Sequence, residues 1–257
     1  MSDYGFILED MYFSYSSVSG FDTCKHQFFL TYINAEERNG NFYSQYGSHI
    51  HDVLEKYFKN ELKMSQLSDY YAENYDNAVT LRPPAFQKNV NETYREKGQI
   101  FFDYFSFDKD LYDVVLIEGS LKVEIDGIKL VVKPDLILKE KSTGKHILFD
   151  YKSSNGFLAS GKRDKKKFTG YIKQMYLYKH YIKKVMNIDI EDIVLWFPRY
   201  DRMEHIEIDV KEEIKTVEWF QNTIKDILNE EDFVANTSND FFCKQLCSVS
   251  QFCEYIK

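Results

Sequence analysis

The spacing of apolar residues changes near residue 112. Before that point, apolar positions recur at the helical period, and they predict helices over Gly20–Ile33 and Tyr46–Leu62. A helical insert is expected over about residues 60–110, and the run Arg82-Pro83-Pro84 divides it into two parts. After residue 112, short runs rich in Val, Leu and Ile alternate with turn residues, a pattern typical of β-strands.

The second half of the chain mixes strands with helices. Strand-like runs are expected at residues 114–126, 128–138, 146–151, 190–200 and 205–210, and helices at 171–186 and 212–230. The pair Asp126-Gly127 is a typical hairpin turn between the first two runs. This order predicts an α/β fold in which a mixed central β-sheet is flanked by helices. We expect one domain over residues 1–257, with its core at about 111–230 and a C-terminal segment at 240–257.

Two acidic residues and a lysine lie on a predicted hairpin with arms Leu130–Leu138 and His146–Tyr151. Asp135 follows a proline in the first arm, and Asp150 closes the apolar run of the second. Lys152 comes two residues later, so its side chain points the same way as that of Asp150. Such a group can hold a divalent metal and orient a water molecule. The alternative is two strand-end polar residues with a solvated lysine.

Further candidates lie on the helices and on one strand. His51, on the helix over 46–62, is either structural or a ligand. Gln174 and Tyr178 are four residues apart and share a helix face, where a surface glutamine and a core tyrosine are the alternative interpretation. Glu118 precedes the hairpin strands, and we interpret it as an exposed strand acid rather than a site residue. The basic run at 162–167 reads as a solvated loop or as a contact for phosphate groups.

Charge and the N-terminal residues narrow the class of protein. The formal net charge is −8, which argues against a protein that merely coats nucleic acid but leaves room for an enzyme with a local basic groove. The N-terminus carries acids where a secretory signal needs basic residues, and no apolar run reaches the roughly 18 residues of a membrane span. We therefore expect a cytoplasmic protein that does not bind membranes.

Four cysteines lie at the two ends of the chain. Cys24 is in the first predicted helix, and Cys243, Cys247 and Cys253 fall within the last fifteen residues. In a cytoplasmic protein this grouping favours a metal or cluster site over disulfides. For Cys24 taken alone, a small buried side chain is the alternative.

Taken together, these elements resemble the PD-(D/E)XK nucleases. The most similar branch is the RecB-like one that carries an iron–sulfur cluster, with AddB nuclease domains, CRISPR-associated exonucleases and phage relatives. The resemblance runs from Ser17 to Cys253 and follows the family's order of motifs. These motifs are the serine-led helix with Cys24, the G-x-x-x-H of Gly47–His51, Asp135 in PDLIL, the DYK of Asp150–Lys152, the Q-x-x-x-Y of Gln174–Tyr178 and the cysteine trio.

The resemblance implies a fold, a site and an activity. The fold would be a restriction-endonuclease-like core whose termini are joined at the four cysteines. His51, Asp135, Asp150 and the carbonyl of Tyr151 would bind Mg²⁺ or Mn²⁺, while Lys152 acts in catalysis together with both aspartates. Gln174 and Tyr178 would help to bind substrate and to brace the site. The position of the basic run, between the DYK and Q-x-x-x-Y motifs, makes Lys165 and Lys166 candidate substrate contacts. Cys24, Cys243, Cys247 and Cys253 would hold a [4Fe–4S] cluster, for which zinc is the rival.

The expected activity is exonucleolytic hydrolysis of DNA at single-stranded ends, in recombination, repair, phage DNA processing or CRISPR adaptation. The chain lacks a P-loop, so unwinding would come from a helicase or another recombination or adaptation partner. Two alternatives stay open. One is a non-catalytic DNA-binding partner of such a complex, and the other is a structure-specific or RNA-directed nuclease on the same core.

Overall fold

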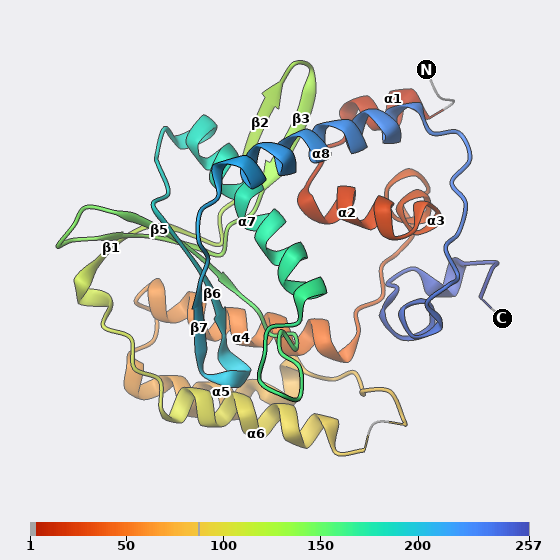
Figure 1. Cartoon of the computed structure of the whole chain (residues 1–257). Coiled ribbons are helices and arrows are strands. Elements are labelled where there is room, and N and C mark those ends of the chain that lie inside the picture. Colours follow the sequence, from red (N-terminus) through yellow and green to blue (C-terminus); the bar gives the residue numbers. More distant parts are fainter. Residues whose placement is uncertain (1–3, 87, 257) are drawn as a thin grey trace.

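The computed structural model describes residues 4–86 and 88–256, and its centre is a five-stranded sheet (Figure 1). The strand order is β1-β4-β5-β6-β7. The strands are β1 (Tyr112–Ile117), β4 (Leu136–Glu140), β5 (His146–Tyr151), β6 (Asp192–Phe197) and β7 (Arg202–His205). Only β5 and β6 pair in parallel; the other neighbours in this sheet are antiparallel. The predicted mixed sheet is thereby confirmed.

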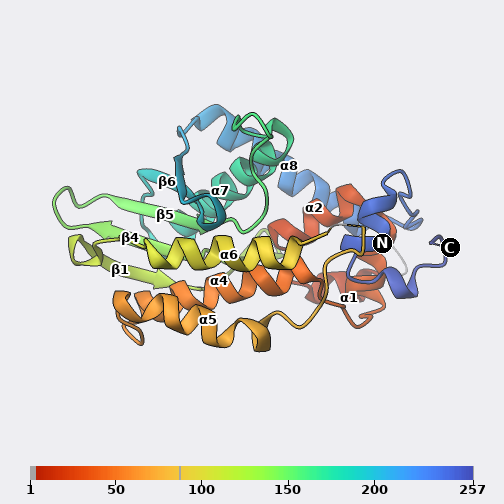
Figure 2. The same ribbon diagram turned by 90° about the horizontal axis from the view of Figure 1, so that it is seen from below.

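Helices cover both faces of this sheet (Figures 1 and 2). On one face lie α4 (Phe42–Phe58), α5 (Leu67–Ala78) and α6 (Val90–Asp103), and on the other lie α7 (Lys165–Met186) and α8 (Val210–Asn229). A hydrophobic core lies on each face of the sheet, and alternate residues of a strand point into opposite cores. Phe149 and Tyr151 pack with the first group of helices, while Leu148 packs with the second. The sheet is therefore buried on both sides, as the near-continuous apolar sequences of β5 and β6 require.

One strand expectation is wrong. The predicted arm Leu130–Leu138 is divided between two sheets, because β3 (Ile128–Val132) forms a two-stranded sheet with β2 (Leu121–Ile125) and β4 begins after the break. Pro134 lies in this break, where its missing N–H removes no ladder hydrogen bond. The hairpin turn at Asp126-Gly127 is confirmed, with both residues at positive φ, 52° and 77°.

The N-terminal helices also differ from the expectation. Instead of one helix over 20–33, α2 (Tyr15–Thr23) ends before Cys24, and α3 (Lys25–Phe28) continues into a π-helical turn, η1 (Phe29–Ile33). Cys24 adopts an extended conformation between α2 and α3, and its Sγ accepts the N–H of Gln27 at 3.4 Å. The cysteine therefore caps α3 rather than lying within an apolar helix face.

Smaller differences concern the ends of elements. Helix α7 begins six residues earlier than expected, since Asp164 caps it, so Lys165 and Lys166 are helical and not in a loop. The strand expected at 205–210 ends at His205, and α8 starts at Val210 behind the cap Asp209. The remaining helical segments are α1 (Gly5–Asp10), η2 (Met64–Gln66), η3 (Lys109–Leu111), η4 (Pro198–Tyr200), η5 (Phe242–Leu246) and η6 (Ser250–Phe252). None of the helices in the described residues combines the length and the apolar character that a membrane crossing requires.

Candidate active site

The two aspartates of the predicted site lie where β4 and β5 pair. Leu136 of β4 is opposite Phe149 of β5, so Asp135 falls beside the end of β5. The backbone N–H of Tyr151 donates to Oδ2 of Asp135 at 2.7 Å, which orients that carboxylate. Asp150 is 2% exposed, and its side chain faces Lys152. The hairpin thus holds both acids at one edge of the sheet.

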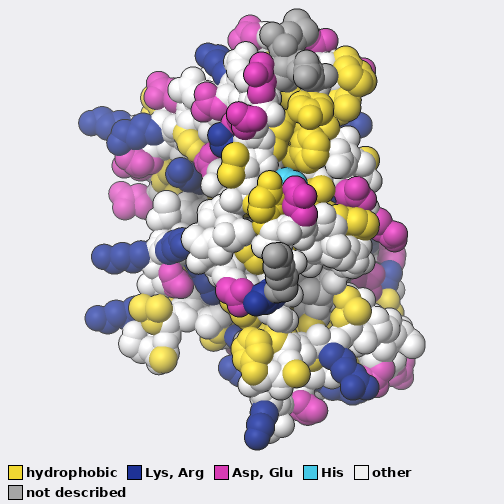
Figure 3. All heavy atoms as spheres, turned by 90° about the vertical axis from the view of Figure 1, so that its right-hand side faces the viewer, with side chains coloured by type: hydrophobic (Ala, Val, Ile, Leu, Met, Phe, Trp, Pro, Cys, Tyr) yellow, Lys and Arg dark blue, Asp and Glu magenta, His cyan; other side chains and the backbone are white. Residues whose placement is uncertain are grey.

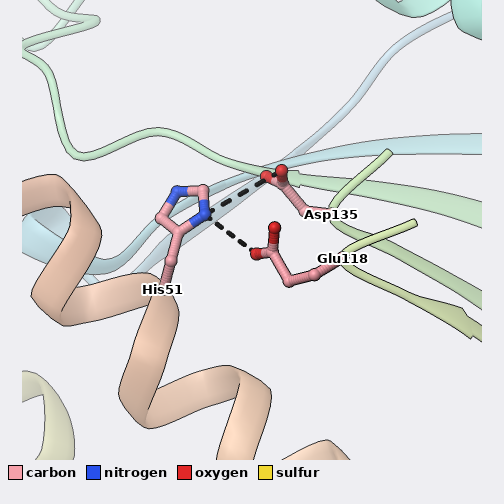
Figure 4. A group of neighbouring side chains, drawn as sticks. All are labelled: His51, Glu118 and Asp135. Carbon is pink, nitrogen blue, oxygen red and sulfur yellow. Dashed lines mark hydrogen bonds and ion pairs between the residues drawn. The ribbon is translucent and has the colours of Figure 1, made fainter. Parts of the chain in front are cut away.

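Helix α4 brings His51 against the same edge (Figure 4). Its Nδ1 lies 3.2 Å from Oε1 of Glu118 and 3.9 Å from Oδ1 of Asp135. On the other side of the ring, Nε2 lies 3.2 Å from the carbonyl oxygen of Tyr151. Within the described residues, His51, Glu118 and Asp135 are the one group of three or more side chains close enough to share a metal ion.

Glu118 was expected to be an exposed strand acid rather than a site residue. It is exposed, but its carboxylate is also turned toward His51. It follows β1 directly and has a positive φ of 44°, a backbone conformation that glutamate seldom adopts. Its N–H donates to the carbonyl of Asp135 at 2.8 Å, which ties the two acidic positions together. The signal in the sequence was Glu-Gly at the end of a strand whose partner strand begins directly after Asp135.

Lys152 sits in a chain of polar contacts that leads to α7. Its Nζ lies 2.5 Å from Oδ2 of Asp150 and donates to Oε1 of Gln174 at 2.8 Å. The amide of Gln174 in turn donates to the hydroxyl of Tyr178 at 3.0 Å. The predicted residues Asp150, Lys152, Gln174 and Tyr178 are therefore brought together. Sequence reasoning missed Tyr171, whose ring centroid lies 4.8 Å from the same Nζ.

Burial and neighbouring charges at this edge shift the pKa values of His51 and Asp135. Burial opposes a charged His51, but the hydrogen bond with Glu118 and the negative charges of Asp135, Glu118 and Asp150 outweigh it and raise the His51 pKa to about 9. Burial and the neighbouring Asp150 raise the pKa of Asp135 to about 7, even though His51 and Lys152 act in the opposite direction. The site therefore carries more negative charge than its own cations balance, which is the condition a bound cation relieves.

Lys165 and Lys166 do not reach this cluster. They are exposed in the first turn of α7, and no hydrogen bond or ion pair joins their side chains to the aspartates within the described residues. Lys167, beside them, donates to the carbonyl of Asn155 at 2.5 Å. The basic run thus borders the loop that follows Lys152.

Cys24 and Cys243, from the two ends of the chain, both contact the backbone of Asn236. The N–H of Asn236 donates to Sγ of Cys24 at 3.3 Å, and Sγ of Cys243 donates to the carbonyl of Asn236 at 3.7 Å. Burial, together with the nearby thiols of Cys24 and Cys253, raises the pKa of Cys243. All four cysteines are free thiols. Figure 3 faces this end of the molecule, where apolar patches lie between acidic and basic side chains.

The fold and this edge of the sheet define a nuclease of the restriction-endonuclease-like class. Residues 12–254 match the family model of the PD-(D/E)XK nuclease superfamily, and the chain belongs to that superfamily. A crystal structure of a "putative exonuclease" from Eubacterium rectale is similar in fold, with a TM-score of 0.51 and 12% identity over 98% of this chain and 91% of that one. A crystal structure of the protein SSO0001 has a TM-score of 0.40 and 14% identity over 96% of this chain and 88% of that one. No curated protein matches the chain.

Proposed function

We propose that this chain is a metal-dependent DNA exonuclease that hydrolyses phosphodiester bonds at single-stranded ends, in recombination, repair, phage DNA processing or CRISPR adaptation. The observation that carries the proposal is the meeting of His51, Asp135, Asp150 and Lys152 at the end of β5. These residues come from separate motifs of the sequence, and the chain belongs to the PD-(D/E)XK nuclease superfamily, which also supports the proposal.

The donors at this edge fit a hard divalent cation. Carboxylate oxygens suit Mg²⁺, while an imidazole in the set also suits Mn²⁺. Oδ2 of Asp150 is buried without a hydrogen bond of good geometry, although Lys152 lies beside it. His51, Asp135, Asp150 and the carbonyl of Tyr151 would hold the ion, and Glu118 is an additional carboxylate within reach of His51. When bound, such an ion lowers the pKa of a water ligand and offsets the charge of the scissile phosphate.

The protein's own groups then act on the water and the phosphate. Lys152 places a positive charge where negative charge develops as water attacks phosphorus, and such a preorganised donor stabilises the transition state. Asp150 and Gln174 hold the lysine from two directions, so its ammonium group is fixed before substrate arrives. Tyr178 holds the amide of Gln174 in turn, which supports a bracing role for Gln174 and Tyr178.

The test is cleavage of end-labelled single-stranded DNA with Mg²⁺ or Mn²⁺. Wild-type protein should shorten linear strands and leave circular strands intact. Lys152→Ala and Asp150→Ala should each lower the rate by about 100-fold or more. Lys139→Ala, an exposed lysine on the same hairpin, is the matched control and should retain wild-type activity. Cutting of circular strands would refute exonuclease action, and activity that survives in both variants would refute the site.

The competing proposal is a non-catalytic DNA-binding partner. It would be favoured if wild-type protein bound single-stranded DNA but left it uncut with either metal. The intact set of His51, Asp135, Asp150 and Lys152 favours the enzyme, because a binding protein has no need of all four.

For the cysteines we propose a [4Fe–4S] site that joins the two chain ends, with zinc as the rival. Its support is the approach of the tail to Cys24 through Asn236 and the mutual effect of the thiols on the pKa of Cys243. Backbone N–H groups directed at sulfur, as at Cys24, also accompany thiolate ligands of clusters. Anaerobically purified protein should be brown and absorb near 400 nm. Colourless protein that contains zinc would refute the cluster.

A further inference from the structure

A hollow of about 450 Å³ opens beside the loop that follows Lys152. The residues that give it chemical character are Asn155, Phe157, Leu158, Tyr200 and Arg202. Two segments form it: the loop between β5 and α7, and η4 with the start of β7. The hollow is separate from the metal-binding edge, because its lining includes neither the aspartates nor His51.

The walls of this hollow combine aromatic rings with cations. The rings of Phe157 and Tyr200 meet edge to face with centroids 5.3 Å apart. The guanidinium of Arg202 lies 4.3 Å from the centroid of Phe157. Outside the lining, Nζ of Lys97 lies 5.4 Å from the centroid of Tyr200. Leu158 leaves 53% of its surface exposed at the rim. Aromatic faces with basic neighbours are how proteins stack the bases of single strands.

Asn155 supplies a polar group to the same hollow. Its Oδ1 accepts the hydroxyl of Tyr200 at 2.5 Å and the N–H of Phe157 at 3.1 Å. These two donors fix which end of the amide is oxygen, so Nδ2 is the free end. Among the described residues, Nδ2 has no hydrogen-bond partner, and it remains available as a donor to a ring carbonyl of a base.

The hollow lies close to the reacting centre along the chain. Asn155 is three residues after Lys152, a span of at most about 11 Å. The basic run at 162–167 continues from the same loop into α7, and Lys167 bonds the carbonyl of Asn155. A strand whose phosphate lies at Lys152 therefore meets the hollow a short distance along its length, with lysines beside its backbone.

We propose that the hollow bounded by Asn155 and Tyr200 binds one nucleobase of a single-stranded substrate, within a few nucleotides of the phosphate that is cut. This inference rests on the proposed exonuclease function and adds a base-stacking subsite to it. The contact is made to a π-face and to a ring carbonyl, so it favours unpaired strands over duplex ends, in which the bases remain stacked.

The experiment compares oligo(dT) with an abasic strand of equal length and charge. Fluorescence anisotropy measures both affinities in the Lys152→Ala background with Mg²⁺, and a gel verifies that the strands stay intact. The Lys152→Ala parent, which retains Tyr200, should bind oligo(dT) about 5- to 150-fold more tightly than the abasic strand. Tyr200→Leu should abolish that preference but keep the abasic affinity within about twofold, since phosphate contacts carry it. Tyr200→Phe keeps the ring and should keep the preference.

Three results would overturn the subsite. They are equal affinity of the parent protein for the two strands, equal loss of both affinities in Tyr200→Leu, and binding of thymidine monophosphate alone as tightly as oligo(dT). Cleavage by wild-type protein separates this failure from that of the proposed function. A protein that prefers bases but does not cut refutes the exonuclease only, whereas one that cuts without the preference refutes the subsite only.

Discussion

Helix α4 approaches the loop after β5 so closely that position 47 has no room for a methyl group. A Cβ added to Gly47 would lie 2.7 Å from Oγ and 3.5 Å from Cβ of Ser153. The first distance is shorter than real Cβ contacts, so either the hydroxyl or the loop must move. Ser153 directly follows Lys152, and movement of the loop therefore displaces the lysine. This contact is a physical reason for glycine in the G-x-x-x-H motif.

Two opposing effects decide the outcome of Gly47→Ala. Alanine is favoured over glycine in a helix interior by about 1 kcal/mol. Overpacking against Ser153 costs about 1–3 kcal/mol. The single substitution should thus lower the free energy of unfolding by about 0–2 kcal/mol. In a Ser153→Ala background the nearest remaining atom is Cβ at 3.5 Å, an ordinary contact. In that background only the higher helix propensity of alanine acts, and Gly47→Ala should raise the free energy of unfolding by about 0.5–1 kcal/mol.

Urea unfolding of the wild type, the two single variants and the double variant measures this difference. The coupling energy of the cycle should be about 1–3 kcal/mol. Cleavage of single-stranded DNA should fall in Gly47→Ala and recover when Ser153→Ala is added, because the loop returns Lys152 to its place. An equal effect of Gly47→Ala on stability in the two backgrounds would refute the reasoning.

Three further predictions concern the site. The His51 pKa of about 9 lies above the ordinary 6.5, so protonation of His51 stabilises the metal-free fold below pH 6.5, and this contribution is lost as the pH rises through 9. A metal ion binds only the neutral imidazole of His51, so the affinity for Mn²⁺ should rise with pH up to about 9, and binding should release a proton. Calorimetry in two buffers of different ionisation enthalpy measures this proton release, and its absence would contradict the prediction. Glu118→Gln removes a charge that raises the His51 pKa, so the midpoint of an NMR titration of His51 should move to lower pH, and an unchanged midpoint would be evidence against the contact. Tyr171→Leu removes the ring beside Lys152 and should lower kcat by about 2- to 30-fold, whereas Tyr171→Phe keeps the ring and should keep kcat. If both variants lost kcat equally, the effect would belong to the hydroxyl of Tyr171, which contacts Ser154.

Much of the site was predictable because its motifs are local. Asp150 lies on β5 and Lys152 directly follows that strand, two residues after Asp150, and their side chains meet as strand spacing requires. Gln174 and Tyr178 are four apart on a helix and form a hydrogen bond. The mixed sheet followed in the same way from the alternation of strand-like and helix-like runs. In each case the regular repeat of a strand or helix determines which side chains share a face.

What could not be predicted depends on how separate elements meet. Glu118 reaches His51 because β1 pairs with β4 and because the residue takes a positive φ, and no period in the sequence marks either condition. The apolar run through Pro134 gives no sign that β3 and β4 join different sheets. The spacing of residues along the chain does not predict how closely α4 approaches the loop after β5. The glycine at position 47 is the one sign of this close approach in the sequence. Where a motif residue has no side chain, the neighbour that excludes one is thus part of the site, and here that neighbour is Ser153.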